Sequence, residues 1–553
     1  MKDPQQSNAR QWLVWTPLLL ASMLVVGITI GMQLQSRGPV FSLSAEEIPR
    51  ADGFGHGKLE ELLRYIDAKY VDNVDRDKLI QDAIDQILGD LDPHSTYLSV
   101  DRVREESERL DGNFEGIGVE FMILDDTIRV VAPVIDGPSE EAGVLAGDNI
   151  ITIEDSLVAG VGMETDEIID RLRGPKDSQV RIGILRYPEK ELRQVTIRRD
   201  RIPVESLDAA YMIDPEIGYV RINRFSATTA QEFNTHVREM VDSGGMKDIV
   251  LDLRQNPGGY LRSAVDILSQ FFTEKNKLLV YTEGRTSQRE DWKTSGRALF
   301  PIRNVVVLID EGSASASEIL AGAIQDYDRG IIVGRRSYGK GLVQEQYNLS
   351  DGSAVRLTVA RYYIPSGRSI QKDYDDRVAY AHDLEERAQN GELYFQDSLP
   401  SLDTLAYYTA TGRKVYGGGG IYPDVFVPLD SSYQDQDASR LQAQIPAFVF
   451  RRLPVFQQQY KGLSLDEFRK QFKSGAEWWD DLLAYAREKD GPIDEGEVLA
   501  RKGEILNLLK ARIARQLYDS QAFYIVLNER DNDVKEALKI LHKPDPLSIL
   551  LKK

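Results

Sequence analysis

The sequence predicts a multidomain protein of the α/β (or α+β) class with helical segments at both ends. Three observations support this prediction. The 553 residues are enough for three or four domains of about 100–200 residues each. Apolar strand patterns alternate with helical patterns between residues 217 and 428. Residues 58–110 carry apolar side chains at helical spacing, and residues 430–553 are rich in charged residues and helix formers.

The first segment predicts a membrane anchor. Trp12 to Met32 is an uncharged, almost wholly apolar run, and about 20 such residues span a bilayer as a helix. Lys2 and Arg10 precede it, which favours a cytoplasmic N-terminus for residues 1–11. We expect residues 12–32 to be a single-pass signal anchor in the cell inner membrane, with the rest of the chain facing the periplasm or the outside. The alternative is a cleaved signal peptide, for which Leu43-Ser44-Ala45 is a poor cleavage site.

Residues 46–110 are expected to form an N-terminal helical segment, and residues 111–201 a small β-rich module. The helical spacing of the first segment breaks at Leu91-Asp92-Pro93-His94. In the module, a glycine-rich loop at 115–121 leads into short alternating strands, and one helix follows late, near residues 166–172.

Residues 202–428 carry the α/β pattern. The expected strands are Tyr219–Ile222, Ile249–Leu253, Val305–Ile309, Ile331–Val333 and Val355–Tyr363, and the expected helices are Leu261–Phe271 and Ser317–Ile324. Four glycines, Gly417 to Gly420, precede an apolar segment at 421–427 that reads as a strand. We interpret them as a tight turn, because a phosphate loop would lead into a helix N-terminus. We interpret the tail, 430–553, as a helical packing or dimerisation appendage, which leaves a homo-oligomer open.

The composition excludes several kinds of chemistry. The formal net charge is −20, so a phosphate backbone would be repelled, and we expect no nucleic-acid partner. The chain has no cysteine, which excludes thiolate catalysis, thiolate metal sites and disulfides. No glycine-x-serine-x-glycine turn occurs. The histidines are scattered and are interpreted as structural or exposed, so no metal site is predicted: His56, His94, His236, His382 and His542.

Two glycine- and serine-rich segments remain, at 312–323 and 334–344. The second fits the first seven positions of a phosphate-binding loop, from Gly334 to Lys340. An ATPase is nevertheless rejected, because Gly341 replaces the magnesium-binding serine or threonine and a strand, not a helix, follows. The acidic strand that would complete an ATPase also precedes the loop, which is the reverse of the usual order.

The first segment places a serine at the start of a helix. Ser315 and Glu318 form a Ser-x-x-Glu capping box, which is the structural interpretation. Capping does not exclude catalysis, because backbone N–H groups at a helix start can bind an oxyanion. Without a histidine, a neutral lysine is needed as the base, and burial lowers a lysine pKa. Lys340 lies among glycines before an apolar strand, and Gln344 would lie on the same side of that strand and orient the amine without adding charge.

These residues resemble the carboxyl-terminal processing (tail-specific) protease family. Its serine, lysine and glutamine are matched by Ser315, by Lys340 25 residues later, and by Gln344 four residues beyond. Leu253-Arg254-Gln255-Asn256-Pro257-Gly258-Gly259 matches the family's glycine loop, so the resemblance implies an oxyanion hole from the backbone N–H groups of Gly259 and Ala316. Segments 91–97, 365–371 and 415–420 match further blocks of the family.

The 111–201 module resembles a PDZ domain inserted beside an α/β Ser-Lys protease core. Its carboxylate-binding loop would be Gly116-Ile117-Gly118-Val119, and Arg173 resembles an arginine that couples the module to catalysis. The resemblance implies a serine endopeptidase without a cofactor that acts on polypeptides with exposed C-termini. The alternative is a non-catalytic PDZ scaffold on a protease-like fold. The resemblance covers residues 58–428 and implies nothing for the tail.

Overall fold

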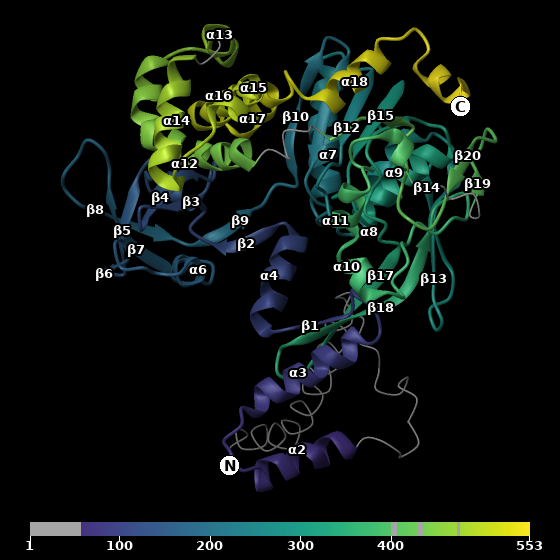
Figure 1. Cartoon of the computed structure of the whole chain (residues 1–553), viewed down its shortest axis with the longest axis horizontal. Coiled ribbons are helices and arrows are strands. Elements are labelled where there is room, and N and C mark those ends of the chain that lie inside the picture. Colours follow the sequence, from purple (N-terminus) through teal and green to yellow (C-terminus); the bar gives the residue numbers. More distant parts are fainter. Residues whose placement is uncertain (1–56, 400–405, 430–435, 473–475, 553) are drawn as a thin grey trace, which may run out of the picture. The chain divides into compact units, whose positions relative to one another are not determined.

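A computed structural model describes residues 57–399, 406–429, 436–472 and 476–552 (Figure 1). The expected anchor at 12–32 lies outside these residues. In the part that the model describes, no helix is long and apolar enough to cross a membrane. The chain divides into two compact units, residues 1–80 and residues 81–553.

The described part of the first unit is helical, as its apolar spacing predicts. Helix α2 spans Lys58–Lys69 and has no buried residue, and α3 (Arg76–Gly89) begins in this unit. Arg76 pairs with Asp67 at 2.8 Å.

A six-stranded sheet forms the centre of the second unit. Its order is β10-β11-β12-β15-β16-β21, and every neighbouring pair is parallel except β10 and β11. The strands are β10 (Leu207–Asp214), β11 (Ile217–Ile222), β12 (Asp248–Asp252), β15 (Asn304–Ile309), β16 (Ile331–Gly334) and β21 (Val425–Phe426). Parallel strands have their carboxyl ends at one edge, so the loops that follow β12, β15 and β16 lie close together there.

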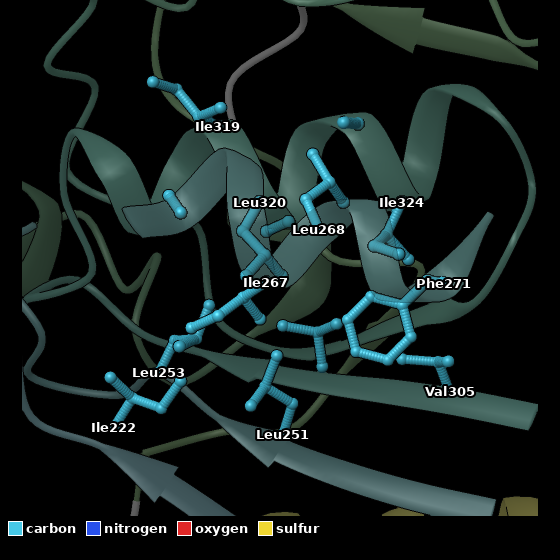
Figure 2. Packing of buried hydrophobic residues seen from close by; sticks show 14 of the residues in the cluster. Ile222, Leu251, Leu253, Ile267, Leu268, Phe271, Val305, Ile319, Leu320 and Ile324 are labelled. Atoms are coloured by element: carbon cyan, nitrogen blue, oxygen red, sulfur yellow. The ribbon is translucent and has the colours of Figure 1, made fainter. Parts of the chain in front are cut away.

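Both faces of this sheet are buried, which explains its almost continuous apolar strands. Leu251 and Val305 face helices α7 (Thr229–Asp242), α8 (Leu261–Leu268) and α9 (Ala316–Asp326). Figure 2 shows this layer, with Leu268 and Leu320 above the strands. The residues next to Leu251 and Val305 along the strands point to the opposite face of the sheet, because alternate side chains of a strand point to opposite faces. There they pack against α18 (Asn532–Leu541).

The second unit also contains an antiparallel sheet. It consists of β1 (Thr96–Leu98), β18 (Ala354–Tyr363), β13 (Lys275–Glu283) and β14 (Glu290–Ser295), with β17 (Leu342–Asn348) also paired to β18. Smaller elements complete the core: α10 (Arg377–Ala381), α11 (Asp383–Gln389), β19 (Ala406–Tyr408) and β20 (Lys414–Tyr416).

The predicted β-rich module begins and ends in two paired strands. Helix α4 (Val100–Asp111) leads into β2 (Asn113–Gly116), which pairs with β9 (Asp200–Pro203). Between them lie β3 (Val119–Leu124), β4 (Thr127–Pro133), α5 (Pro138–Glu141), β5 (Asn149–Ile153), β6 (Ser156–Leu157), α6 (Thr165–Leu172), β7 (Gln179–Leu185) and β8 (Arg193–Arg198). These strands enclose an aliphatic core of their own. The pairing of β2 with β9 brings the two ends of the insertion together.

The tail is helical throughout its described residues. It comprises α12 (Gln436–Gln459), α13 (Leu465–Gln471), α14 (Ala476–Asp490), α15 (Glu495–Ala500), α16 (Lys502–Leu517), α17 (Ser520–Leu527) and α18. Phe450 and Leu453 of α12 pack on Val131 of the module, and Arg515 pairs with Glu120 of β3 at 2.8 Å. The tail thus contacts both the module and the central sheet.

The predicted mixture of helices and strands is confirmed. The expected strand at 421–427 is wrong in part, because only Val425–Phe426 forms β21. The backbone N–H of Ile421 donates to Ser337 Oγ (2.6 Å) and its carbonyl accepts from the Ser337 N–H (3.1 Å). These bonds take up the groups that a longer strand would use.

Candidate active site

One cavity of about 780 Å³ contains all five residues that the sequence predicts for catalysis. It is lined by residues of the three loops that follow β12, β15 and β16, together with α4, β17 and β18. The five predicted residues in its lining are Gly259, Ser315, Ala316, Lys340 and Gln344.

Ser315 is the N-cap residue of α9 and has an unusual backbone conformation. Its φ of 56° and ψ of −112° lie outside the regions that L-residues favour, and such strain is concentrated at functional sites. Two neighbouring serines face elsewhere: Ser313 Oγ donates to the carbonyl of Leu253 and Ser317 Oγ to that of Asn256. Both are fully buried and neither lines the cavity, so Ser315 is the serine of this segment that substrate could reach.

Two glycines allow the β12 loop to approach Ser315 closely. A Cβ on Gly258 would lie 2.8 Å from the Cβ of Ser315, and one on Gly259 would lie 2.1 Å from the Phe225 carbonyl oxygen. Both have positive φ, 98° and 141°. Among the described residues, the backbone N–H groups of Gly259 and Ala316 have no hydrogen-bond partner. Two unpaired donors beside a serine are the requirement for an oxyanion hole.

Lys340 is positioned by neutral groups. Its Nζ donates to Oε1 of Gln344 (2.8 Å), and the Gln344 amide in turn donates to the backbone carbonyl of His94 (2.6 Å). The predicted contact between Lys340 and Gln344 is therefore present. Sequence reasoning missed His94, whose turn is held by Asp92: the Asp92 carboxylate accepts from the backbone N–H groups of His94 and Ser95, both at 2.8 Å.

The electrostatic environment favours a neutral amine. Burial lowers the pKa of Lys340, and the nearby charge of Arg356 lowers it further, against smaller opposing effects of Glu318, Asp92 and Glu106. Burial, and then the charge of Lys340, lower the pKa of His94 to about 4, so this histidine is uncharged at neutral pH. It adds no charge of its own to the site.

Glu318 connects the serine loop to the lysine loop. It is fully buried, and its carboxylate accepts from the backbone N–H groups of Ser315 (2.8 Å), Gly339 (2.7 Å) and Lys340 (2.9 Å) and from Ser337 Oγ (2.5 Å). Burial raises its pKa to about 7, although these four hydrogen bonds act in the opposite direction. The sequence predicts only the capping contact with Ser315; the contacts to the lysine loop required the tertiary structure.

Residues of the tail contact the loops around the cavity. The sequence did not predict this role of the tail. Arg254, in the glycine loop, donates to Asp531 (2.9 Å) and to Asp533 (2.8 Å) at the start of α18. Asp533 also lies 3.8 Å from Arg335, in the loop after β16. Arg335 in turn pairs with Glu311 of the serine loop at 2.8 Å. Two tail carboxylates thus neutralise arginines that belong to the loops around the cavity.

The predicted carboxylate loop of the module lies outside this cavity. Among the described residues, the N–H groups of Ile117 and Gly118 donate to no acceptor, while the Ile117 carbonyl accepts from Ser139. Arg173 lies between this loop and α4. Its Cα is 3.7 Å from where a Cβ on Gly116 would lie, and its guanidinium pairs with Glu108 of α4 at 2.8 Å.

The amino-acid sequence of this chain is similar to those of known peptidases. Residues 216–378 match the model of peptidase family S41, and residues 441–519 match a family of unknown function, DUF8443. The carboxy-terminal-processing protease of Bartonella bacilliformis is 36% identical over 317 residues, which cover 56% of this chain and 71% of that protein. The carboxy-terminal processing protease CtpB of Bacillus subtilis is 35% identical over 319 residues, which cover 57% and 65%.

Two solved structures are also similar. The photosystem II D1 C-terminal processing protease is 30% identical, with 57% of this chain and 84% of that chain covered and a TM-score of 0.31. The PDZ domain of the carboxy-terminal protease from Vibrio cholerae, solved in complex with a peptide, is 30% identical, with 17% and 99% covered and a TM-score of 0.16.

The family and sequence matches show that the protein is a serine-type peptidase with an α/β core. It belongs to the carboxy-terminal processing proteases of peptidase family S41.

We predict that Asp533→Asn destabilises the protein and lowers its peptidase activity. The change leaves Arg254 and Arg335 with less compensating charge, and breaking a buried ion pair costs about 3–5 kcal/mol. We expect the lower end of this range, because Asp531 still pairs with Arg254. Chemical denaturation measures the loss. Glu536→Gln on the same helix is the control, since Glu536 pairs only with the exposed Lys539 in the described structure. Equal stability of both variants would show that the tail contacts are dispensable.

Proposed function

We propose that this protein is an endopeptidase in which Ser315 is the nucleophile and Lys340 is the general base. The observation that carries the proposal is the convergence of Ser315, Lys340 and Gln344 in one cavity, with Glu318 bound to the backbone of both catalytic loops. Tyr362 adds a second connection, because its hydroxyl donates to the carbonyls of Ser315 and Lys340.

In the first step, Ser315 Oγ attacks the carbonyl carbon of the scissile peptide bond. The Oγ–H bond breaks, its proton passes to the neutral Nζ of Lys340, and the substrate oxygen becomes an oxyanion. The N–H groups of Gly259 and Ala316 donate to that oxyanion. When the tetrahedral intermediate collapses, the carbon–nitrogen bond breaks and Lys340 returns the proton to the leaving amine.

In the second step, water hydrolyses the ester between substrate and Ser315. Lys340 takes a proton from the water, whose oxygen attacks the acyl carbon, and then protonates Ser315 Oγ as the acid product leaves. The amide of Gln344 fixes the direction of the amine in both steps. A carboxylate in that position would raise the pKa of Lys340 and hold the amine protonated.

We predict that Ser315→Ala and Lys340→Arg both abolish cleavage of an unfolded protein substrate without unfolding the enzyme. Alanine removes the nucleophile, and arginine cannot lose its proton at accessible pH. Ser317→Ala is the matched control, because this serine lies on the same helix but does not reach the cavity. Wild-type turnover by Ser315→Ala would reject Ser315 as the nucleophile, whereas no cleavage by the wild-type enzyme itself would favour a non-catalytic scaffold.

The pH profile provides a second check of the same assignment. Because only neutral Lys340 accepts a proton, the rate should rise as pH passes upward through its pKa. Burial lowers that pKa, so the midpoint should lie below 10.5. A rate that is independent of pH between 6 and 10 would contradict lysine as the base.

We further propose that the PDZ module binds the free C-terminus of the substrate through the 116–119 loop. The unpaired N–H groups of Ile117 and Gly118 are suited to a carboxylate, and β3 has one unpaired edge at which a peptide strand could add. Arg173 then transmits occupancy to α4, since it contacts both. The substrates would be exported proteins with exposed, apolar C-terminal tails.

Amidation of a peptide substrate's C-terminus should lower kcat/KM several-fold, because it removes the charge and leaves all other contacts. Arg173→Ala should reduce the difference between acid and amide. Arg171→Ala is the control, as this residue of α6 pairs with Glu167 within its own helix. If wild-type enzyme cleaves acid and amide peptides equally at all concentrations, the module does not sense the carboxylate.

We also propose that residues 12–32 hold the protein in the inner membrane with its peptidase outside the cytoplasm. The support is the uncharged run of 21 residues and the preceding Lys2 and Arg10. After cell fractionation and a carbonate wash, we expect full-length protein in the membrane pellet. A soluble protein whose N-terminus is near residue 46 would demonstrate a cleaved signal peptide.

A further inference from the structure

The cavity around Ser315 is basic, although the whole chain carries a formal charge of −20. Two carboxylates line it, those of Glu106 and Asp111. Against these stand four guanidinium groups, on Arg109, Arg224, Arg262 and Arg356. The balance is therefore positive even with Lys340 neutral. A concave site of one sign attracts ligands of the opposite sign.

The four arginines differ in how far they are neutralised. Arg356 lies 3.5 Å from Glu106, and Arg262 lies 3.3 Å from Asp266. Arg109 shares Glu106 with Arg356, at the longer distance of 4.0 Å. Arg224 donates to the neutral amide of Asn223 (2.9 Å), and no carboxylate of the described chain lies within ion-pair distance of it. Arg109 and Arg224 are thus the pair with unbalanced charge.

These two arginines influence one another. Arg224 is half-buried, and burial followed by the charge of Arg109 lowers its pKa, while Asp208 and Glu232 oppose this more weakly. Asp111 lines the same wall, where its carboxylate accepts from Tyr260 Oη at 3.4 Å. Both arginines line the cavity, and the positive charge of Arg109 disfavours that of Arg224 because like charges repel. A bound carboxylate would relieve that repulsion and accept paired N–H donors.

The position of Arg224 relates this pair to the reacting bond. The next residue, Phe225, donates its N–H to the Gly258 carbonyl (2.9 Å), and its own carbonyl accepts from the Tyr260 N–H (2.7 Å). These bonds join Arg224 directly to the loop that presents the Gly259 N–H. Because Arg109 and Arg224 line the same cavity as Gly259 and Ser315, a group bound by them would lie in the cavity that holds the scissile bond, separate from the 116–119 loop of the module.

We propose that Arg109 and Arg224 form a subsite for a substrate carboxylate next to the scissile bond. This inference rests on the proposed function of the same cavity. The carboxylate belongs either to an aspartate or glutamate side chain or to the substrate's own C-terminus when cleavage occurs close to it. In both cases the enzyme selects substrates by a negative charge near the cut, in addition to any selection by the PDZ module.

The test uses the full-length enzyme and two sets of peptides of known cleavage position. In the first, every peptide has an amidated C-terminus, and one glutamate is moved through the positions flanking the cut, each with a glutamine partner. In the second, all side chains are neutral and the chain ends at increasing distances after the cut, as acid and as amide. The measured quantity is the ratio of kcat/KM for the charged and neutral members of each pair.

For wild type we expect a ratio of about ten at one position, the size typical of a hydrogen bond to a charged group. Arg224→Gln and Arg109→Gln should bring the ratio close to one. Arg262→Gln is the matched control, because this cavity arginine already has Asp266 as its partner, and it should keep the ratio. A glutamate–glutamine ratio well above one at a single position of the first set identifies a side-chain carboxylate, and an acid–amide ratio that rises at one chain length of the second set identifies a terminal one.

Two further variants test whether the charge of Arg224 itself sets the preference. Arg224→Glu should reverse the preference, so that a lysine at the selected position is favoured over a glutamate. Arg173→Ala should leave the glutamate–glutamine preference of the first set unchanged, since it acts at the module, and should lower the acid–amide ratio of the second set equally at every chain length. The subsite would be overturned by ratios near one at every position of the first set together with an acid–amide ratio that does not depend on chain length in the second, or by equal loss in Arg262→Gln. Absence of all peptide cleavage, or cleavage by Ser315→Ala, would instead overturn the proposed function.

Discussion

A single buried carboxylate sets the geometry on which this site depends. Glu318 is covered on all sides, and its two oxygens accept four hydrogen bonds from the serine and lysine loops. Because three donors are backbone N–H groups, the contact fixes the course of both chains and not only one rotamer. The strained backbone of Ser315 is maintained by these bonds together with the first turn of α9. The carboxylate therefore fixes the positions of the two residues proposed as nucleophile and base.

The amine of Lys340, in contrast, has a neutral hydrogen-bond partner. Gln344 accepts from it, the His94 carbonyl orients Gln344, and burial keeps the His94 ring uncharged. Glu318 lies near enough to raise the pKa of Lys340, so its carboxylate opposes the effect of burial. The raised pKa of Glu318 itself reduces this opposition around neutral pH. Lys340 is thus held by neutral hydrogen-bond partners, while burial and the charge of Arg356 lower its pKa.

Residues of the tail, which lie outside the part of the chain that matches family S41, also hold the loops around the site. Two aspartates at the start of α18 bind Arg254, and Asp533 also approaches Arg335, so the glycine loop and the loop after β16 share one charged cluster. Helices α12 and α16 contact strands β3 and β4 of the β-rich module. A segment interpreted from its composition as packing material therefore touches both the catalytic loops and the module proposed to regulate them.

The sequence by itself determined the fold class, because the period of apolar residues is a local property. A serine at a helix start and a lysine among glycines singled out Ser315, Lys340 and Gln344, whereas Gly259 and Ala316 followed from the resemblance to the protease family. The spacing of Ser315, Lys340 and Gln344 is likewise visible along the chain. Only the tertiary structure decided which distant groups support them. Asp533 contacts Arg254 across 279 positions, and the His94 carbonyl meets Gln344 across 250. Such pairs leave no periodic trace in a sequence, since their geometry arises only when segments far apart along the chain pack against one another.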